Sequence, residues 1–337
     1  MQTMAERAAL APQRIAIPEG DDEVMMAAAA EAARRGLAVP VLVGDEAALK
    51  GLAAERGYDV ALFEFVDAGD SAYLDDLVAR YLKLDGIIVG EMMLRASLSD
   101  SLYLSMAMLA AGDVDCAFAG IRATTGDVIA AGQILVGLAD GVEMPSSVAF
   151  FEVPEGADMP AGIVAFGDSA VCVNPTASEL ASIAITCCDT ATDLLGQEAR
   201  CALISHSTCG SADNELAAKV CEAVSLAQGQ RPDLAIDGEF QLDAALLERV
   251  AERKVPRESK VAGHANVLIW PNLDVGNTVV KTLQIFGNVS AYGPMLQGFK
   301  KIVCDCSRGA SVEEIVGNMA VASVRAAALK ARQGGER

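Results

Sequence analysis

The sequence is poor in aromatic residues and histidine, and it contains no long uninterrupted apolar segment. Aromatic side chains make up 4% of the 337 residues, which argues against the aromatic platforms that stack nucleic-acid bases. No apolar run reaches about 18 residues, so we expect no membrane-spanning helix. The N-terminal segment also lacks the charged-then-apolar pattern of a secretory signal. These absences favour a cytoplasmic protein.

Several common catalytic and cofactor motifs are missing as well. The sequence has no glycine-rich dinucleotide or P-loop motif, no Gly-x-Ser-x-Gly, no His-Glu-x-x-His and no Cys-x-x-Cys. The only histidines are His206 and His264, and neither has a recognisable catalytic partner, so we interpret both as structural or loop residues. We therefore expect no metal site and no bound cofactor.

Basic residues are outnumbered by acidic ones. The chain has 26 Lys and Arg against 46 Asp and Glu, which gives a formal net charge of −20. A surface of that sign repels nucleic acid and anionic lipid, so neither is an expected partner. A small anionic ligand remains compatible if a few basic side chains gather in one place. The nine cysteines, an odd number mostly inside apolar runs, are typical of reduced thiols in a cytosolic protein.

Short apolar runs alternate with longer amphipathic stretches along the chain, and the length suits about two domains. This alternation predicts an α/β protein with mostly parallel sheets. Domain boundaries are expected near Asp140–Ser147 and Gly293–Gly298. The predicted strands are Arg14–Pro18, Val39–Gly44, Leu62–Asp67, Cys116–Gly120, Ser147–Val153, Gly162–Val173, Arg200–His206, Asn266–Pro271 and Lys301–Cys306, and predicted helices include Asp22–Arg35, Thr176–Leu195, Ala212–Ala227 and Ser311–Arg332.

The segment with the clearest chemical content is Lys301–Ile315, where an apolar strand runs into Ser307-Arg308-Gly309 and then a helix. Free backbone N–H groups and the helix dipole favour an anion at such a position. Arg308 is suited to bind a phosphoryl group in a bidentate manner, and Ser307 to donate to a developing oxyanion. The alternative is a solvent-exposed turn with Arg308 on the surface and no ligand. Glu314 is either a general base or the capping-box partner of Ser311.

These residues carry a resemblance to the phosphate acetyl/butyryltransferase family, on its phosphate acetyltransferase (phosphotransacetylase) branch. The matching segments occur in the family's order and cover nearly the whole chain. They are Ile15–Glu23, Thr124–Asp127, Asn174–Ile185, Ser205–Ala212, Arg231–Ala245, Val261–Lys281, Gly293–Gly298 and Ser307–Val316.

The resemblance implies two α/β/α domains with a cleft between them, as in isocitrate and isopropylmalate dehydrogenases, usually in a homodimer. By matching segments, domain I is residues 1–140 with 296–337, and domain II is residues 141–295. The implied reaction converts acetyl-CoA and phosphate to acetyl phosphate and CoA, with CoA as a substrate and no cofactor. The expected partners are therefore the small molecules CoA, acyl phosphate and phosphate.

The resemblance also implies a mechanism of direct thiolate attack in a ternary complex. The family's base is an Asp seven residues after the serine, and Glu314 stands at that position here. Ser307 would hold the thiol or the carbonyl oxygen, and Arg308 would neutralise the phosphoryl group. A base near the sulfur matters because a free thiol has a pKa of about 8.5.

Six further residues are implied as substrate-binding: Thr124, Thr125, Asn174, Asn277, Arg80 and Lys281. Structural, helix-capping or surface roles compete for all of them except Arg80, which comes from the segment Arg80–Gly86. Two departures from the family stand out. An anion-binding Arg is replaced by Ala130, with Arg122 nearby as a substitute, and a lysine is replaced by Cys209.

Alternatives remain open at this point. The acyl group could be propionyl or butyryl, since one methylene is worth only about 1–3 kcal/mol in a pocket. The changes at Ala130 and Glu314 also fit a divergent family member that binds CoA or an acyl phosphate but turns over poorly. A decarboxylating dehydrogenase of the same fold would need a cluster of aspartates for Mg²⁺, which we do not find.

Overall fold

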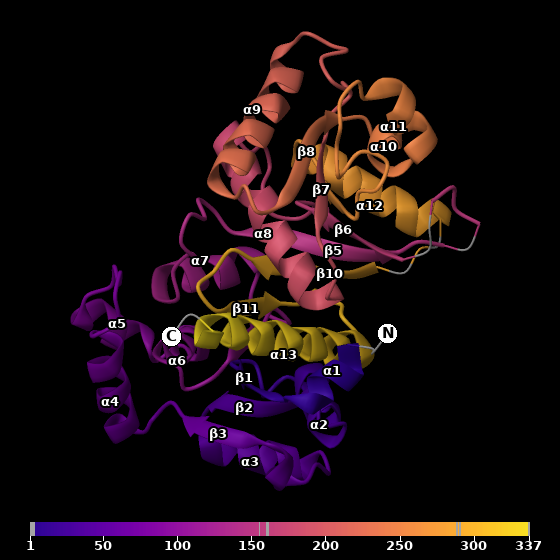
Figure 1. Cartoon of the computed structure of the whole chain (residues 1–337). Helices are drawn as coiled ribbons and strands as arrows, with labels where there is room; N and C mark the ends of the chain where they lie inside the picture. The colour runs from indigo at the N-terminus through magenta and orange to yellow at the C-terminus, as the bar shows by residue number, and fades with distance from the viewer. Residues whose placement is uncertain (1–3, 155, 160–161, 288, 290, 336–337) are drawn as a thin grey trace. The chain divides into compact units, whose positions relative to one another are not determined.

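Two β-sheets organise the chain in the computed structural model (Figure 1). The structure describes residues 4–154, 156–159, 162–287, 289 and 291–335. The chain divides into unit 1, residues 1–139 with 299–337, and unit 2, residues 140–298. The sequence analysis placed the corresponding boundaries at 140 and 296.

The sheet of unit 1 has the strand order β11-β4-β1-β2-β3, and all neighbouring strands are parallel. Because the strands run the same way, their carboxyl ends share one edge, which is where α/β proteins place their sites. The strands are β1 (Gln13–Ile17), β2 (Ala38–Gly44), β3 (Glu64–Asp67), β4 (Cys116–Ala119) and β11 (Ile302–Asp305).

Helices cover this sheet. Every residue of β4 is buried, as expected for a parallel strand packed on both faces. Helix α13 packs against α1 and α2, whereas α6 packs against α4 and α7, and α13 and α6 both contact the sheet. The helices are α1 (Met4–Leu10), α2 (Glu23–Arg34), α3 (Glu46–Glu55), η1 (Val60–Leu62), α4 (Ser71–Tyr81), α5 (Glu91–Ser97), α6 (Ser101–Ala111), α7 (Thr125–Leu135) and α13 (Val312–Gly335).

The sheet of unit 2 is mixed, with the order β10-β5-β6-β9-β7-β8. The β10-β5-β6 part is antiparallel, and β6, β9, β7 and β8 are parallel. The strands are β5 (Ser146–Glu152), β6 (Ile163–Gly167), β7 (Arg200–Ile204), β8 (Ala235–Phe240), β9 (Val267–Ile269) and β10 (Ala291–Gln297), and the helices are α8 (Ala177–Leu195), α9 (Glu215–Gln230), α10 (Leu242–Leu246), α11 (Glu248–Lys254) and α12 (Leu273–Gly287).

Alternate strand residues form an apolar core on one face of the second sheet. Phe151, Phe166 and Trp270 lie at its centre, with ring centroids 4.5 Å apart for the first pair and 5.1 Å for the second. Side chains of α12 pack against the same cluster. The aromatic residues are few, but three of them pack together in this cluster, and such pairs add about 0.5–1.5 kcal/mol each beyond area burial.

The predicted strand Gly162–Val173 is too long, because β6 ends at Gly167. The buried carboxylate of Asp168 ends it by accepting hydrogen bonds from the backbone N–H groups of Ala170, Val171 and Cys172. A side chain that satisfies these donors replaces the strand ladder with a tight turn. The continuing apolar run therefore gave a wrong end point.

Strands β8 and β10 were not predicted. Strand β8 carries Asp237 and Glu239, which interrupt its apolar pattern, yet both are buried. Arg257 and Ser259 pair with Asp237, and Ser207 donates to Glu239, so distant partners make this burial tolerable. Strand β10 contains Pro294 and lies at the sheet edge with a register shift, which is where a strand tolerates proline.

The predicted α/β class with mostly parallel sheets is confirmed. In the described part of the chain, no helix is long and apolar enough to cross a membrane. All nine cysteines are free thiols, and seven of them are buried, as their apolar surroundings in the sequence indicate. Cys209 is half-buried and Cys221 is exposed.

Candidate active site

In unit 1 the loops that follow β1, β4 and β11 lie at the carboxyl edge of three adjacent strands. Asp305 of β11 pairs in register with Ala119 of β4, so the segment with Ser307 and Arg308 leaves the sheet beside the loop that leads to Thr124 and Thr125. The structure thus brings together four of the predicted site residues, which come from two distant parts of the sequence.

Ser307 and Arg308 occupy an exposed turn between β11 and α13. The turn is closed by the Ala310 N–H, which donates to the Ser307 carbonyl at 2.9 Å. Among the described residues, the Ser307 hydroxyl makes only a long contact of 3.4 Å, in which it accepts from the Gly309 N–H, so its own proton is free to donate. Arg308 makes no hydrogen bond or ion pair within the described part of the chain, which leaves its guanidinium available to an anion.

Thr124 and Thr125 begin α7. Thr124 is the N-cap and forms a capping box with Asp127, so the capping role considered from the sequence is confirmed. Thr125 donates its hydroxyl to Asp305 at 2.6 Å, across the two strand-end loops. Burial raises the pKa of Asp305, and the hydrogen bond from Thr125 acts in the opposite direction. Both residues are exposed at a helix N-terminus, where an anion is favoured, and the Thr124 hydroxyl donates to Asp127 at 2.7 Å.

Glu314 forms the capping box of α13. Its Oε2 accepts from the Ser311 N–H at 2.7 Å and from the Ser311 hydroxyl at 2.8 Å. These two hydrogen bonds lower the pKa of Glu314 below its usual 4.5. The group is therefore ionised at neutral pH, as a base must be, but its low proton affinity makes it a weak one. The structure thus confirms the capping contact, and the catalytic role stays a prediction.

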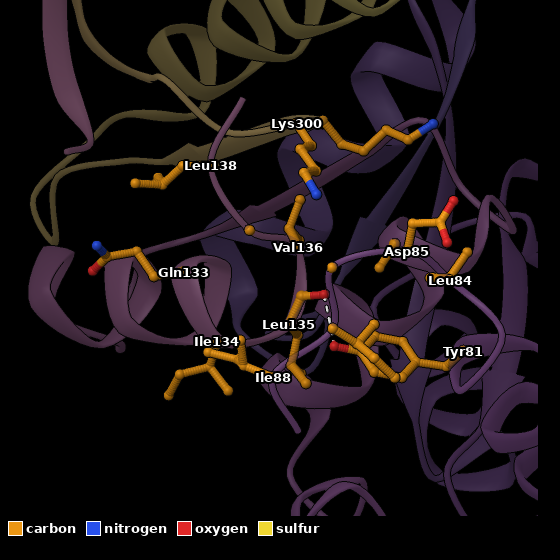
Figure 2. A pocket seen from close by; sticks show the side chains of 15 residues that line it. Tyr81, Leu84, Asp85, Ile88, Gln133, Ile134, Leu135, Val136, Leu138 and Lys300 are labelled. Carbon is orange, nitrogen blue, oxygen red and sulfur yellow. Dashed lines mark hydrogen bonds between the residues drawn. The ribbon is translucent and has the colours of Figure 1, made fainter. Parts of the chain in front are cut away.

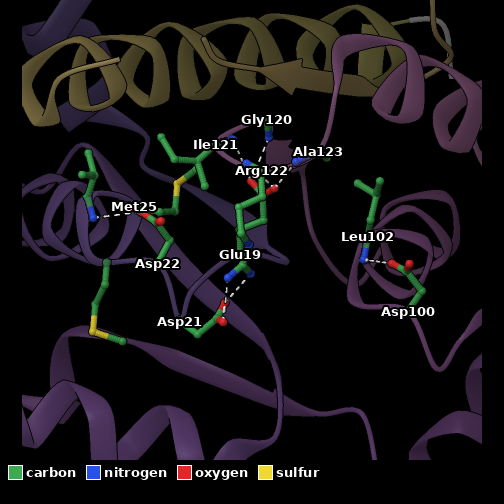
Figure 3. Close-up of polar contacts among 12 residues, drawn as sticks. Glu19, Asp21, Asp22, Met25, Asp100, Leu102, Gly120, Ile121, Arg122 and Ala123 are labelled. Atoms are coloured by element: carbon green, nitrogen blue, oxygen red, sulfur yellow. Dashed lines mark hydrogen bonds and ion pairs between the residues drawn. The ribbon is translucent and has the colours of Figure 1, made fainter. Parts of the chain in front are cut away.

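Two acidic residues after β1 hold the loop that leads into α7 (Figure 3). Glu19 is buried and accepts hydrogen bonds from the backbone of residues 120–123. Asp21 pairs with both terminal nitrogens of Arg122, at 2.8 and 2.5 Å. Arg122 was the proposed substitute for the arginine that Ala130 replaces. Its guanidinium is held by Asp21 rather than free for a ligand.

Arg80 lies away from these residues, although it belongs to the same unit. Its guanidinium forms a two-pronged ion pair with Asp113, at 2.7 and 2.9 Å, and a further pair with Asp76. Asp113 stands just before β4 and accepts from Tyr73, so this cluster lies at the amino edge of the sheet. The structure gives Arg80 a structural role and does not bring it to Ser307, and its predicted contact with substrate stays untested.

Unit 2 contains the other predicted residues, again at the carboxyl ends of parallel strands. Asn174 follows β6, and its side-chain oxygen accepts from the ammonium group of Lys219 at 3.2 Å. Lys219 also donates to the carbonyls of Pro175 and Pro271, at 3.0 and 2.9 Å. Burial lowers the pKa of Lys219. Asn174 can therefore offer its NH₂ group and the second lone pair of its oxygen to a ligand.

Asn277 and Lys281 lie one turn apart on α12. The Asn277 amide donates to the Ser169 carbonyl at 3.3 Å, which ties the helix to the turn around Asp168. Lys281 is exposed, and its ammonium group contacts Gln284 at 3.4 Å. The chain before Asn174 is joined to the start of α12 by the hydrogen bond from the Leu273 N–H to the Val173 carbonyl. Asn174 and Asn277 therefore belong to one loop cluster.

Each unit also has a pocket. The pocket of unit 1 has a volume of about 410 Å³ and lies between the C-terminal ends of α4 and α7 and the start of β11 (Figure 2). Lys300 and Asp85 line it, and the Tyr81 hydroxyl donates to the Leu135 carbonyl beside it. It is at the amino edge of the sheet, and none of the predicted site residues lines it.

The pocket of unit 2, about 310 Å³, lies at the carboxyl end of β7 and is lined by Ser205, His206, Lys219 and Asn272. Lys219 connects it to Asn174. His206 is hydrogen-bonded to Asn214, which agrees with its interpretation as a loop residue. Among the described residues, no group of His, Cys, Asp and Glu side chains is arranged to hold a metal ion.

Sequence reasoning missed Glu19, Asp305 and Lys219. Glu19 and Asp305 had one available signal, namely an acidic residue at or just after the end of an apolar strand. Lys219 had none, because it sits within an amphipathic helix like any surface lysine. Its three oxygen partners come from loops about 45 and 52 positions away.

Comparisons with known proteins give the chain its place. The family model of the phosphate acetyl/butaryl transferases matches residues 1–323. The phosphate acetyltransferase of Clostridium acetobutylicum is 40% identical over 319 residues, which cover 93% of this chain and 94% of that protein. Some curated relatives are longer, such as those of Nitrosomonas europaea and Escherichia coli, and the chain spans less than half of their length.

Solved structures agree. A phosphotransacetylase from Streptococcus pyogenes superposes with a TM-score of 0.87 at 30% identity and covers 96% of this chain and 97% of its own. A Salmonella typhimurium chain assigned as a 4-hydroxythreonine-4-phosphate dehydrogenase has a TM-score of 0.54 at 13% identity, covers 94% of this chain and 99% of its own, and shares the fold alone. From the family match and the near-complete coverage, we conclude that this chain belongs to the phosphate acetyl/butaryl transferase family.

Proposed function

We propose that the chain is a phosphate acetyltransferase, which interconverts acetyl-CoA and phosphate with acetyl phosphate and CoA. The observation that carries the proposal is the unpaired Arg308 beside the Ser307 hydroxyl, at the same strand edge as Thr124 and Thr125. A free guanidinium beside the Ser307 hydroxyl, close to the start of α7, suits a phosphoryl group. Family membership supplies the reaction, since the relatives of nearly equal length carry that name.

The step that the residues serve is acyl transfer to sulfur. The CoA thiolate attacks the carbonyl carbon of acetyl phosphate, the new C–S bond forms, and phosphate leaves with the electrons of the C–O bond. Glu314 takes the thiol proton, Ser307 donates to the carbonyl oxygen or orients the thiol, and Arg308 neutralises the departing phosphate. These groups need no metal or cofactor, and treatment with a chelator should leave the rate unchanged.

Asn174, Asn277 and Lys281 are proposed to contact CoA or the acyl phosphate from unit 2. The NH₂ group of Asn174 suits an acceptor on the ligand, because Lys219 already donates to the side-chain oxygen. Lys281 offers an exposed positive charge to the phosphates of CoA.

The experiment is an assay of purified protein for thioester formation from CoA and acetyl, propionyl or butyryl phosphate, followed by ultraviolet absorbance. We expect turnover with acetyl phosphate as the best donor. A clear preference for propionyl or butyryl phosphate would move the chain to another branch of its family. Folded protein that binds CoA but turns over none of the donors would instead support a binding protein.

We also propose that the chain works as a homodimer in the cytoplasm. Nine free cysteines suit a reducing compartment. Ile285 and Phe286, at the end of α12, are 73% and 87% exposed, and Tyr292 of β10 is 47% exposed. Exposed large apolar side chains suit burial against a second copy. Light scattering should give twice the chain mass, and Phe286→Glu should shift it toward the monomer.

A further inference from the structure

Glu19 is a buried carboxylate with an unusual set of partners. It follows β1 directly and is 6% exposed. Its Oε2 accepts from the N–H groups of Gly120 and Ile121, at 2.8 and 2.9 Å. Its Oε1 accepts from those of Arg122 and Ala123, at 2.9 and 2.7 Å. Four consecutive backbone donors therefore converge on one side chain, as Figure 3 shows.

Successive N–H groups that point to one place form the kind of concave site that binds phosphate in many proteins. Here the protein's own carboxylate fills it. These four N–H groups are therefore not available to a substrate phosphate, and the next residues along the chain, Thr124 and Thr125, begin α7. Because the four hydrogen bonds satisfy both oxygens of the carboxylate, its burial is tolerated.

The loop held by Glu19 is continuous with the proposed site. Residue 123 is followed by the N-cap Thr124 and then by Thr125, which donates to Asp305. On the other side, Gly120 packs against the backbone of Cys306, which precedes Ser307. A shift of residues 120–123 would therefore displace Thr124 and Thr125 and disturb the segment that presents Ser307 and Arg308.

We propose that Glu19 is a positioning residue, which fixes the β4–α7 loop so that Thr124, Thr125 and the Ser307-Arg308 turn meet the phosphoryl group of the substrate. This rests on the proposed acetyltransferase function. Glu19 itself touches no substrate. Its carboxylate is a permanent anion that holds the loop in the conformation to which the phosphoryl group of the substrate binds.

The test compares Glu19→Gln with Asp22→Ala. Glutamine keeps the size of the side chain but presents an NH₂ group to two of the four N–H donors. Asp22 lies in the same loop and caps α2 through the N–H groups of Val24 and Met25 without touching residues 120–123. The Asp22→Ala variant is therefore a control for a general loss of stability in this part of the fold.

Hydrogen exchange is the first readout. In Glu19→Gln, the amides of residues 120–123 should exchange at least about tenfold faster, while those of β4 stay protected. Asp22→Ala should leave residues 120–123 unchanged. Equal exchange of these amides in wild type and Glu19→Gln would show that Glu19 does not hold the loop and would overturn the proposal.

Kinetics is the second readout. In Glu19→Gln, kcat/KM for acetyl phosphate should fall about 10- to 100-fold, whereas the KM for CoA should stay within about twofold. Equal losses for both substrates, or the same pattern in Asp22→Ala, would reduce Glu19 to a stability residue. Absence of turnover in wild type would refute the proposed function and the positioning role with it, while hydrogen exchange would still decide whether Glu19 holds the loop.

Discussion

The hydroxyl of Thr125 donates to the carboxylate of Asp305 at 2.6 Å, across 180 positions of the sequence. This hydrogen bond joins the first turn of α7 to the end of β11, two residues before Ser307. A hydroxyl that donates to Asp305 can offer a ligand only its lone pairs, unless the bond breaks. The pair therefore decides what Thr125 can do at the proposed site.

Replacement of Asp305 should stabilise the protein at neutral pH. Burial raises the pKa of Asp305 in the folded state, so the folded protein holds this proton more tightly than the unfolded chain does. The free energy of unfolding is therefore higher at acid pH, and this gain is lost as the pH rises through the folded pKa. Asp305→Asn keeps an acceptor for Thr125 and removes the buried charge. We expect Tm to rise by about 2–4 °C at neutral pH and the gain to vanish below about pH 4. A lower Tm at neutral pH would contradict this.

Arg308→Ala should weaken the use of phosphate and acetyl phosphate much more than the use of CoA. A hydrogen bond to a charged group is worth about 1.5–3 kcal/mol, so kcat/KM for acetyl phosphate should fall at least about tenfold. The measurement is a set of initial rates with each substrate varied in turn. Arg95→Ala is the control, since Arg95 is a surface arginine of α5 already paired with Glu91 and Asp75. Equal loss for both substrates would sink the assigned role.

Glu314→Gln should lower turnover at neutral pH while the fold is retained. The hydrogen bonds from Ser311 lower the pKa of Glu314, so it stays ionised until the pH falls below its usual 4.5. We expect kcat of the wild type to show no titration of Glu314 near neutral pH, and kcat of the variant to be at least about tenfold lower. Glu179→Gln provides a matched control, because Glu179 is the equivalent capping-box residue of α8. A near-normal rate in Glu314→Gln would leave only the capping role.

The cluster around Asp113 should make stability sensitive to acid. Burial acts to raise the pKa of Asp113, but hydrogen bonds from Arg80 and Tyr73 outweigh it, and the pKa lies below the usual 3.8. Its stabilising contribution to the free energy of unfolding is therefore present above about pH 4 and is lost as the pH falls through the folded pKa. Asp113→Asn should lower Tm at neutral pH, and the gap to wild type should close in acid. A gap that is constant with pH would show that the charge is irrelevant.

Gly120→Ala should be strongly destabilising. Gly120 has φ of +109°, and a Cβ there would lie 2.6 Å from the backbone N and O of Cys306. Gly57 has φ of +77° with nothing near a Cβ, so Gly57→Ala measures backbone strain alone. Urea denaturation should show a loss of about 1 kcal/mol for Gly57→Ala and at least about 2–3 kcal/mol for Gly120→Ala. Equal losses of stability in the two variants would mean that the backbone at Cys306 moves to make room for the added methyl group.

Much of the fold was predictable because strands that are buried on both faces consist of continuous apolar runs in the sequence. Strands β1, β2, β4 and β7 lie close to their predicted ranges for that reason. Strand β8 was missed because Asp237 and Glu239 break its run, and their partners come from other parts of the chain. Local pattern cannot show a partner that only folding supplies.

The candidate site divides in the same way. The sequence by itself determined the family, the α/β class and the Ser307-Arg308 turn, because a strand, a turn and a capped helix follow one another along the chain. Only the tertiary structure decided that Arg80 and Arg122 are already paired, that Arg308 is not, and that Glu19 occupies the donors of the β4–α7 loop. Ion pairs and hydrogen bonds to backbone N–H groups join residues that are far apart in the sequence. A local sequence pattern therefore cannot predict them.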